Sequence, residues 1–190
     1  MRKKYILLSI TFILIVGLMV TSWFEDQDTI GKEVDSYLGI PVYYNGPIYE
    51  KSYGKHYSSE GYYYGQKWQC VEFIKRFYHD ALDHKMPEVY GHARDFFNLT
   101  LPHGAYNAER DLYQYYNGQG EKPEVNDILV FQDSTYGHVA VITKVEEEYI
   151  EVIQQNIYGK PREKFDIVEK NGQYSIGSQK KQPVGWLHKK

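Results

Sequence analysis

Cys70 is the only cysteine in this 190-residue chain. A single thiol cannot close a disulfide within its own chain, so it is either a reactive group or an inert core side chain. Apolar side chains recur at helical spacing after it, which predicts a helix over residues 69–83 with Cys70 in the first turn. The unpaired N–H groups and the dipole of a helix start favour a thiolate. A buried core cysteine is the commoner fate of one cysteine taken alone, and this pattern does not exclude it.

A thiol nucleophile needs a base to take its proton, and an imidazole is the usual choice. His138 is the best placed of the seven histidines, because Gly137 precedes it and an apolar strand is predicted after it. His79 and His84 lie too far along the predicted helix to reach its first turn. The other four fall in predicted loops or chain ends: His56, His92, His103 and His188.

A third group must orient the imidazole and fix its tautomer. The strand predicted after His138 ends in Gln154-Gln155-Asn156. An antiparallel neighbour would bring this end back beside His138. We expect either Gln154 or Asn156 to orient the ring, although an amide gives no counter-charge to an imidazolium.

The elements that must position these residues form an α+β domain, with the cysteine helix packed on an antiparallel β-sheet. Strands are predicted over 127–132, 138–145, 149–155, 164–168, 173–176 and 184–187, the last closing the sheet. Glu146-Glu147-Glu148 and Asn171-Gly172 are predicted turns between strands. A short helix is predicted over 92–99, and the Tyr-rich segment 53–65 is expected to be an ordered loop before Cys70.

The N-terminus predicts export from the cytoplasm. Arg2, Lys3 and Lys4 precede an apolar run that begins at Tyr5, so residues 1–24 are either a signal peptide or a membrane anchor. We expect a linker over 25–39 and one domain over 40–190. The domain would be secreted or held at the outer face of the cell membrane, because the basic end stays inside.

Composition and motifs exclude several other functions. Removal of residues 1–22 takes the net charge from −3 to −6, since three basic and no acidic residues are lost, which argues against nucleic acid as a partner. One cysteine and scattered histidines argue against a zinc site, and we expect no metal and no cofactor. The Gly-x-Ser-x-Gly motif of serine hydrolases does not occur.

Four segments together resemble the CHAP family of cysteine- and histidine-dependent amidohydrolases and peptidases. They are Lys67-Trp68-Gln69-Cys70-Val71-Glu72-Phe73, Asn126-Asp127-Ile128-Leu129-Val130-Phe131, Gly137-His138-Val139-Ala140-Val141-Ile142 and Gln154-Gln155-Asn156, and the closing Val184-Gly185-Trp186-Leu187 also fits. The resemblance runs from about Ile40 to the end. It implies a papain-like fold, with Cys70 as nucleophile and His138 as base. Many family members carry glutamate sixteen residues after the histidine, where this chain has Gln154.

The resemblance also implies a thioester mechanism with an oxyanion hole. The Cys70 backbone N–H would be one donor, and the side chain of Gln69, Tyr63 or Tyr64 another. Exported members cleave amide bonds of peptidoglycan. Within the family the chain is most similar to glutathionylspermidine amidase domains, which cut a small peptide amide. A wall-binding module with weak or lost catalysis is the third alternative, because of Gln154.

Overall fold

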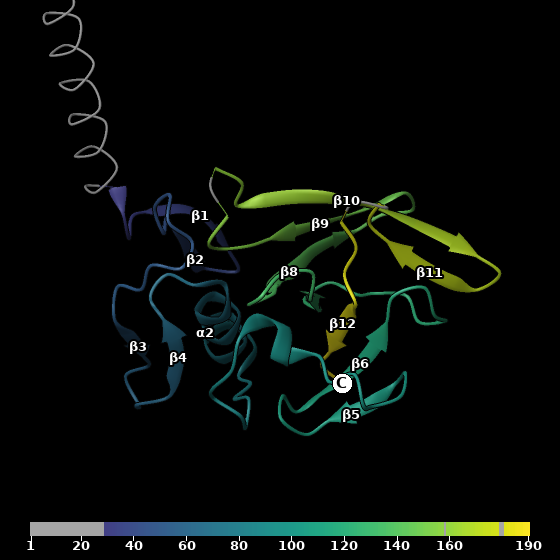
Figure 1. Cartoon of the computed structure of the whole chain (residues 1–190), viewed down its shortest axis with the longest axis horizontal. Coiled ribbons are helices and arrows are strands. Elements are labelled where there is room, and N and C mark those ends of the chain that lie inside the picture. The colour runs from purple at the N-terminus through teal and green to yellow at the C-terminus, as the bar shows by residue number, and fades with distance from the viewer. Residues whose placement is uncertain (1–28, 158, 179–180) are drawn as a thin grey trace, which may run out of the picture.

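The computed structural model describes residues 29–157, 159–178 and 181–190 (Figure 1). The predicted signal peptide or anchor at residues 1–24 lies outside this range. Among the described residues, no helix is long and apolar enough to cross a membrane.

One α-helix, α2 (Cys70–Leu82), begins at the cysteine as the periodicity predicts. Its apolar stripe is buried, and Phe73, Ile74 and Phe77 have no exposed surface. The helix ends at Asp83, which adopts a left-handed conformation (φ 48°) and donates its N–H to the carbonyl of Tyr78. Such a left-handed cap is a common helix end.

An antiparallel sheet of eight strands supports the helix. Its strands are ordered β11-β10-β9-β8-β7-β12-β6-β5. Their bounds are β5 (Ala105–Asn107), β6 (Leu112–Tyr116), β7 (Ile128–Phe131), β8 (His138–Val145), β9 (Tyr149–Ile153), β10 (Arg162–Lys170), β11 (Gln173–Ile176) and β12 (Gly185–His188).

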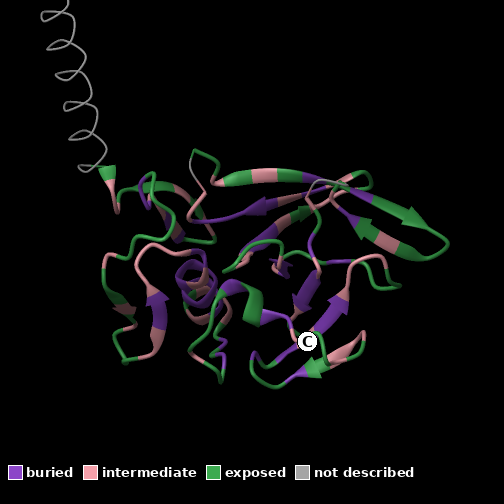
Figure 2. Cartoon of the chain, viewed as in Figure 1, coloured by how far each residue is buried: buried purple, intermediate pink, exposed green. Residues whose placement is uncertain are grey.

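Residues on β8 alternate between two hydrophobic clusters, as successive side chains of a strand must. Val139 and Val141 face α2 and join the cluster that contains Cys70. Ala140 and Ile142 face the other side and join a cluster with Trp186. Figure 2 shows the resulting buried centre at α2 and the middle strands, with the β10–β11 hairpin reaching into solvent.

The sheet curls so that its two ends approach each other. Phe165 of β10 and Tyr115 of β6 lie in the same cluster although their strands are far apart in the strand order. Beyond β6, Gln119 forms an isolated antiparallel bridge with Tyr174 of β11. The second cluster is therefore enclosed by the curved sheet itself.

Two small hairpins lie outside the large sheet. The first, β1 (Glu33–Tyr37) with β2 (Ile40–Tyr43), begins inside the range 25–39 that we predicted to be a linker. The second, β3 (Lys55–Tyr57) with β4 (Tyr63–Gln66), occupies the predicted Tyr-rich loop. Cross-strand pairs of tyrosine, such as Tyr57 with Tyr63, explain why this segment is a hairpin.

Several predicted elements change in detail. β9 ends at Ile153, so residues 154–155 are not strand, and the short helix is one 3₁₀ turn, η1 (Ala93–Phe96). β12 does not close the sheet at an edge but lies between β7 and β6. β5 and β6 were not predicted. The bounds of β7, β8, β10 and β11 agree with their predicted ranges to within two residues, and β10 extends two residues beyond its predicted range at each end.

Candidate active site

Helix α2 begins at Cys70, and no side chain caps its N-terminus. Gln69 occupies the N-cap position in an extended conformation, and its side chain makes no capping hydrogen bond. The first N–H groups of a helix have no partner within the helix, so they are free to face a nearby group. The N–H groups of Cys70 and Val71 act on the Cys70 sulfur in this way, as does the N–H of Val139 from β8. The thiol therefore lies beside the beginning of β8.

A glycine lets β4 approach the first turn of α2. Gly65 has φ +143°, and a Cβ there would lie 3.2 Å from Cα and N of Glu72. A larger residue would push β4 away from the helix start. The glycine five residues before Cys70 is thus required by close packing of two backbones.

Burial controls the ionisation of Cys70. Its side chain belongs to the hydrophobic cluster between α2 and the sheet. Burial raises the pKa of the thiol to about 11, and the N–H groups of Val139, Val71 and Cys70 only partly oppose this. The expectation that the helix start would favour a thiolate is therefore wrong for this structure. Desolvation of the charged sulfur outweighs the favourable N–H groups, so the thiol is neutral at pH 7.

The backbone before His138 can be formed only by glycine. Gly137 has φ +70°, and a Cβ there would lie 2.6 Å from both the Arg94 nitrogen and the Phe131 oxygen. Real Cβ atoms do not come that close to backbone atoms. Gly137 therefore fixes how the chain enters β8 and where His138 begins.

Gln154 orients the His138 ring. The Nε2 atom of His138 lies 3.0 Å from Oε1 of Gln154. The Gln154 amide nitrogen donates to the carbonyl of Lys160 at 3.0 Å and to the carboxylate of Glu163 at 3.1 Å. Both partners accept, so the amide oxygen must face the ring, and His138 must donate from Nε2. Nδ1 is left without a proton and is the atom of His138 that can serve as base.

The imidazole is neutral in the free protein. Burial lowers the pKa of His138 to about 4. The hydrogen bond that the ring donates to Gln154 opposes this shift, and the positive charge of Lys181 adds to it. Within the described part of the chain, no hydrogen bond joins the Cys70 thiol to His138. Hydrogen bonds between catalytic groups are often long in a free enzyme and shorten when substrate binds.

Asn156 makes hydrogen bonds with other described residues but none with His138. Its amide nitrogen donates to the Tyr49 carbonyl at 3.0 Å and to Oε1 of Gln69 at 2.6 Å. Its oxygen accepts from the Asn45 amide at 2.7 Å. Of the two predicted orienting residues, the structure therefore places Gln154 at the ring and Asn156 at the loop before Cys70.

The sequence pattern assigns no role to Gln155, the amide that lies between these two residues. Its amide nitrogen donates to the Gln69 carbonyl at 3.0 Å and to Glu72 at 2.6 Å, and its oxygen accepts from the Tyr43 N–H at 2.8 Å. Glu72 is fully buried and also bonds His56 and Arg76. Burial raises the pKa of Glu72, but the hydrogen bond from His56 and the charge of Arg76 outweigh it, so the net shift is downward.

These three consecutive side chains therefore have three different tasks. Gln154 holds the His138 ring, Gln155 holds the backbone carbonyl of Gln69, and Asn156 holds the side chain of Gln69. The end of β9 thus sets the position of both halves of the site.

The three side chains predicted as oxyanion donors are engaged elsewhere. Gln69 uses its amide nitrogen on the carbonyls of Tyr49 and Lys51, both at 2.9 Å. The Tyr64 hydroxyl donates to the carboxylate of Asp80 at 2.6 Å. Asp80 lies ten residues after Cys70, and thus about 15 Å further along the helix. The Tyr63 ring packs against Tyr57. The backbone N–H groups of Cys70 and Val139 remain as donors at the thiol.

The sequence matches the CHAP domain family over residues 61–156, just over half of the chain. The matched range holds the thiol, the imidazole and all three amides. The bifunctional glutathionylspermidine synthetase/amidase of Escherichia coli K12 is 29% identical over 128 residues, which are 60% of this chain and 20% of that protein. Trypanothione synthetase of Crithidia fasciculata is 27% identical over 161 residues, 78% of this chain and 24% of that protein. The chain thus spans about a quarter or less of these relatives' length.

Proposed function

Because the chain belongs to the CHAP domain family, we propose that it hydrolyses amide bonds with Cys70 as nucleophile and His138 as general base. One arrangement carries the proposal: the buried thiol at a helix start lies beside the strand whose first residue is His138, and Gln154 holds that ring with Nδ1 free. The family and the α+β fold are consistent with the papain-like arrangement that we infer for this site.

In acylation, the Cys70 sulfur attacks the substrate carbonyl carbon while the thiol proton passes to Nδ1 of His138. The carbonyl oxygen becomes an oxyanion, and the N–H groups of Cys70 and Val139 are the donors available to it. Collapse of this intermediate breaks the C–N bond. The imidazolium returns its proton to the leaving amine, and a thioester remains on Cys70.

In deacylation, His138 takes a proton from water, and the hydroxide attacks the thioester carbonyl. The C–S bond breaks, the carboxylic acid leaves, and the thiol recovers its proton from His138. Since both groups are neutral in the free protein, proton transfer accompanies attack rather than preceding it.

We propose peptidoglycan as the substrate, on the outer side of the cell membrane. The support is in the sequence: a basic, then apolar N-terminus would carry the domain away from cytoplasmic substrates. Tyr49 and Tyr57, which precede Cys70 in the chain, are exposed, and aromatic faces of this kind pack on sugars and peptides.

A small peptide amide is the second candidate, because two of the similar proteins are named as glutathionylspermidine synthetase/amidases. The segment before Cys70 is held by polar contacts of Gln69 and Asn156 with backbone carbonyls. A fixed segment of this kind suits a compact peptide as well as a polymer.

The test incubates the full chain, in detergent, with purified cell walls and separately with glutathionylspermidine, and identifies products by mass spectrometry. Cys70→Ala, verified as folded by circular dichroism, is the control. New amino groups or free stem peptides from walls, absent with the control, support peptidoglycan. Spermidine release alone favours the small amide, and no product from either substrate contradicts the proposed hydrolysis and favours a binding module.

A further inference from the structure

The carboxylate of Glu163 accepts a hydrogen bond from Gln154, the amide that orients His138. Glu163 lies opposite Val152 in the β9–β10 pairing, which places it diagonal to Gln154 on the same face of the sheet. The Gln154 backbone N–H bonds the Pro161 carbonyl at 2.8 Å and continues the pairing past the end of β9. Glu163 can therefore reach the Gln154 amide nitrogen, at 3.1 Å.

Without Glu163, the Gln154 side chain would be less well fixed. An amide can turn over and present either its oxygen or its nitrogen to a neighbour. If the nitrogen faced the ring, it would donate to Nε2, and Nδ1 would carry the proton and lose its role as base. An ionised carboxylate accepts only, so it excludes that orientation.

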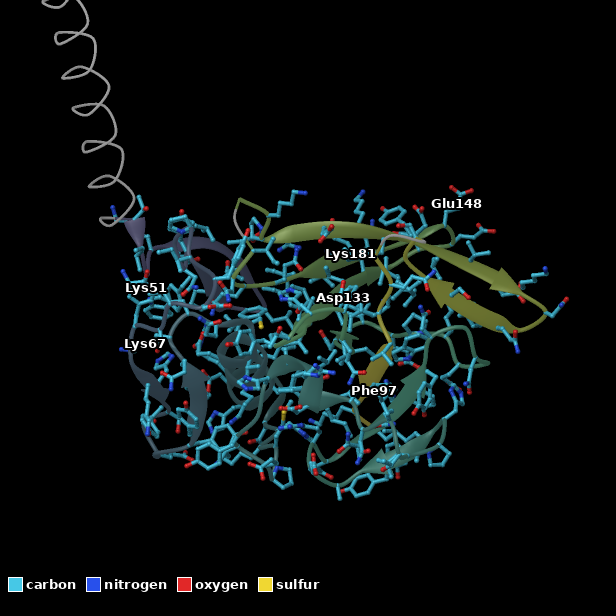
Figure 3. All side chains as sticks on the ribbon, in the orientation of Figure 1. Lys51, Lys67, Phe97, Asp133, Glu148 and Lys181 are labelled. Carbon is cyan, nitrogen blue, oxygen red and sulfur yellow. The ribbon has the colours of Figure 1, made fainter. Side chains whose placement is uncertain are left out.

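Lys181 keeps Glu163 ionised and in place. Its Nζ lies 2.7 Å from the Glu163 carboxylate and packs over the rings of Phe131 and Phe165. Burial raises the pKa of Glu163, but the hydrogen bonds from Lys181 and Gln154 outweigh it, and the net shift is downward. Figure 3 labels Lys181 near the middle of the molecule, in the same area of the view as Asp133.

We propose that Glu163 is a positioning residue of this enzyme: by accepting a hydrogen bond from the Gln154 amide, it fixes the orientation of that amide and thereby the tautomer of His138. This inference rests on the proposed amidase function. It also explains how the site can work where the resemblance leads one to expect glutamate but the chain has Gln154. The carboxylate is present, but one side chain further from the ring.

The charged groups that face His138 are Glu163, Asp133 and Lys181. Glu163 and Asp133 raise its pKa, whereas Lys181 lowers it. Removal of Glu163 or of Lys181 should therefore move the titration of His138 in opposite directions. A residue with a purely structural role would not produce such a pair of opposite shifts.

The experiment compares Glu163→Gln and Lys181→Met with the unchanged chain. The tautomer and titration of His138 are read from long-range ¹H–¹⁵N correlation spectra of ¹⁵N-histidine-labelled protein. Amide hydrolysis is measured on the substrate identified above, as a pH profile of kcat/KM. The matched control is Asp166→Asn, which removes a negative charge from the opposite, exposed face of the same strand.

With Glu163→Gln we expect a mixed tautomer and a lower His138 pKa. We also expect kcat to fall roughly tenfold at unchanged KM, because only a fraction of the molecules would keep Nδ1 free to act as base. With Lys181→Met the His138 pKa should rise. Asp166→Asn should match the unchanged chain. The proposal is overturned if Glu163→Gln leaves both tautomer and pKa unaltered, or if the two variants shift the pKa in the same direction.

An exchange of positions gives a second test. Gln154→Glu alone would set two carboxylates side by side, so we expect slower hydrolysis and a lower melting temperature. Gln154→Glu together with Glu163→Gln should restore hydrolysis to at least the original rate, and a double variant no faster than Gln154→Glu would contradict the proposal. The spectra need no substrate, so tautomer shifts without any hydrolysis would refute the proposed function while supporting the role of Glu163.

Discussion

The carboxylate of Glu72 lies 2.6 Å from Nε of Arg76, one helical turn further along α2, and Glu72 has no exposed surface. The same carboxylate accepts from Gln155, which also holds the carbonyl of Gln69. A buried ion pair two residues after Cys70 therefore connects the helix start to the end of β9.

Removal of one member of this pair should be costly. We expect Arg76→Met to lower the free energy of unfolding by about 3 kcal/mol, because it leaves a buried charge with less compensation. Arg76→Met with Glu72→Gln should recover part of the loss. Since the pKa of folded Glu72 is lowered, its stabilisation is present above about pH 4.5 and is lost as the pH falls through the folded pKa. Urea unfolding at pH 7 and pH 4 measures both effects, and an Arg76→Met variant as stable as the original would contradict the first.

The neutral thiol predicts slow alkylation. With a pKa of about 11, only on the order of 10⁻⁴ of Cys70 is thiolate at pH 7. We expect the iodoacetamide reaction of the free protein to be slow at pH 7 and to accelerate as the pH approaches 11. Mass spectrometry follows the single alkylation. A fast rate that is constant between pH 5 and 8 would instead show a preformed thiolate–imidazolium pair.

Hydrolysis should proceed over a wider pH range than alkylation of the free thiol. The reaction needs one proton shared between thiol and imidazole, and that state prevails between the two pKa values of about 4 and about 11. We therefore expect a broad, bell-shaped profile of kcat/KM. A sharp optimum limited by a group near pH 7 would show that another residue is the base.

Gln154→Ala and Asn156→Ala should fail in different ways. Gln154→Ala frees the His138 ring, so kcat should fall by at least about tenfold with little change in KM. Asn156→Ala removes support from Tyr49 and Gln69, so stability should fall by about 1–3 kcal/mol while the His138 tautomer is kept. Steady-state kinetics and urea unfolding separate the two effects. Equal effects of both variants on kcat and stability would reject this division of roles.

Gly137→Ala should disturb the site through the backbone. Its Cβ would lie 2.6 Å from two backbone atoms at φ +70°, so we expect a loss of more than about 2 kcal/mol and of most activity. Gly39→Ala is the matched control, because Gly39 has φ +80° but nothing within 4 Å of its Cβ position. Gly39→Ala should lower the free energy of unfolding only by the strain of a left-handed backbone conformation, about 1 kcal/mol. Similar losses in both variants would mean that the contacts at Gly137 are not limiting.

The sequence predicts the parts of this site that depend on local pattern. The 3.6-residue periodicity locates α2 and sets Cys70 at its start, and Gly137 with the alternating apolar residues locates β8 and His138. The amides of residues 154–156 could be identified as a group, but not separated. Their tasks depend on where β9 ends and on how each side chain turns after it, and neither feature has a local signal.

The sequence pattern does not show which residues that are distant along the chain come into contact. Glu163 stands on β10 among alternating charged and apolar residues, which is the ordinary pattern of a half-exposed strand. Only the β9–β10 register brings it to Gln154. Likewise, the pattern could not show that burial would outweigh the effect of the helix start on the Cys70 thiol, because the packing of β2, β4 and β8 on α2 depends on the whole fold.

The bonds that hold residues 154–156 join parts of the chain that are synthesised far apart: Gln155 reaches Gln69 over 86 positions and Tyr43 over 112. Contacts between such distant residues form slowly, since the entropy of closing the intervening chain must be overcome first. The arrangement of this site therefore depends on long-range closure of the chain and not on α2 alone. The proposed nucleophile and base are thus held by contacts that span most of the domain, and only the complete fold brings these contacts together.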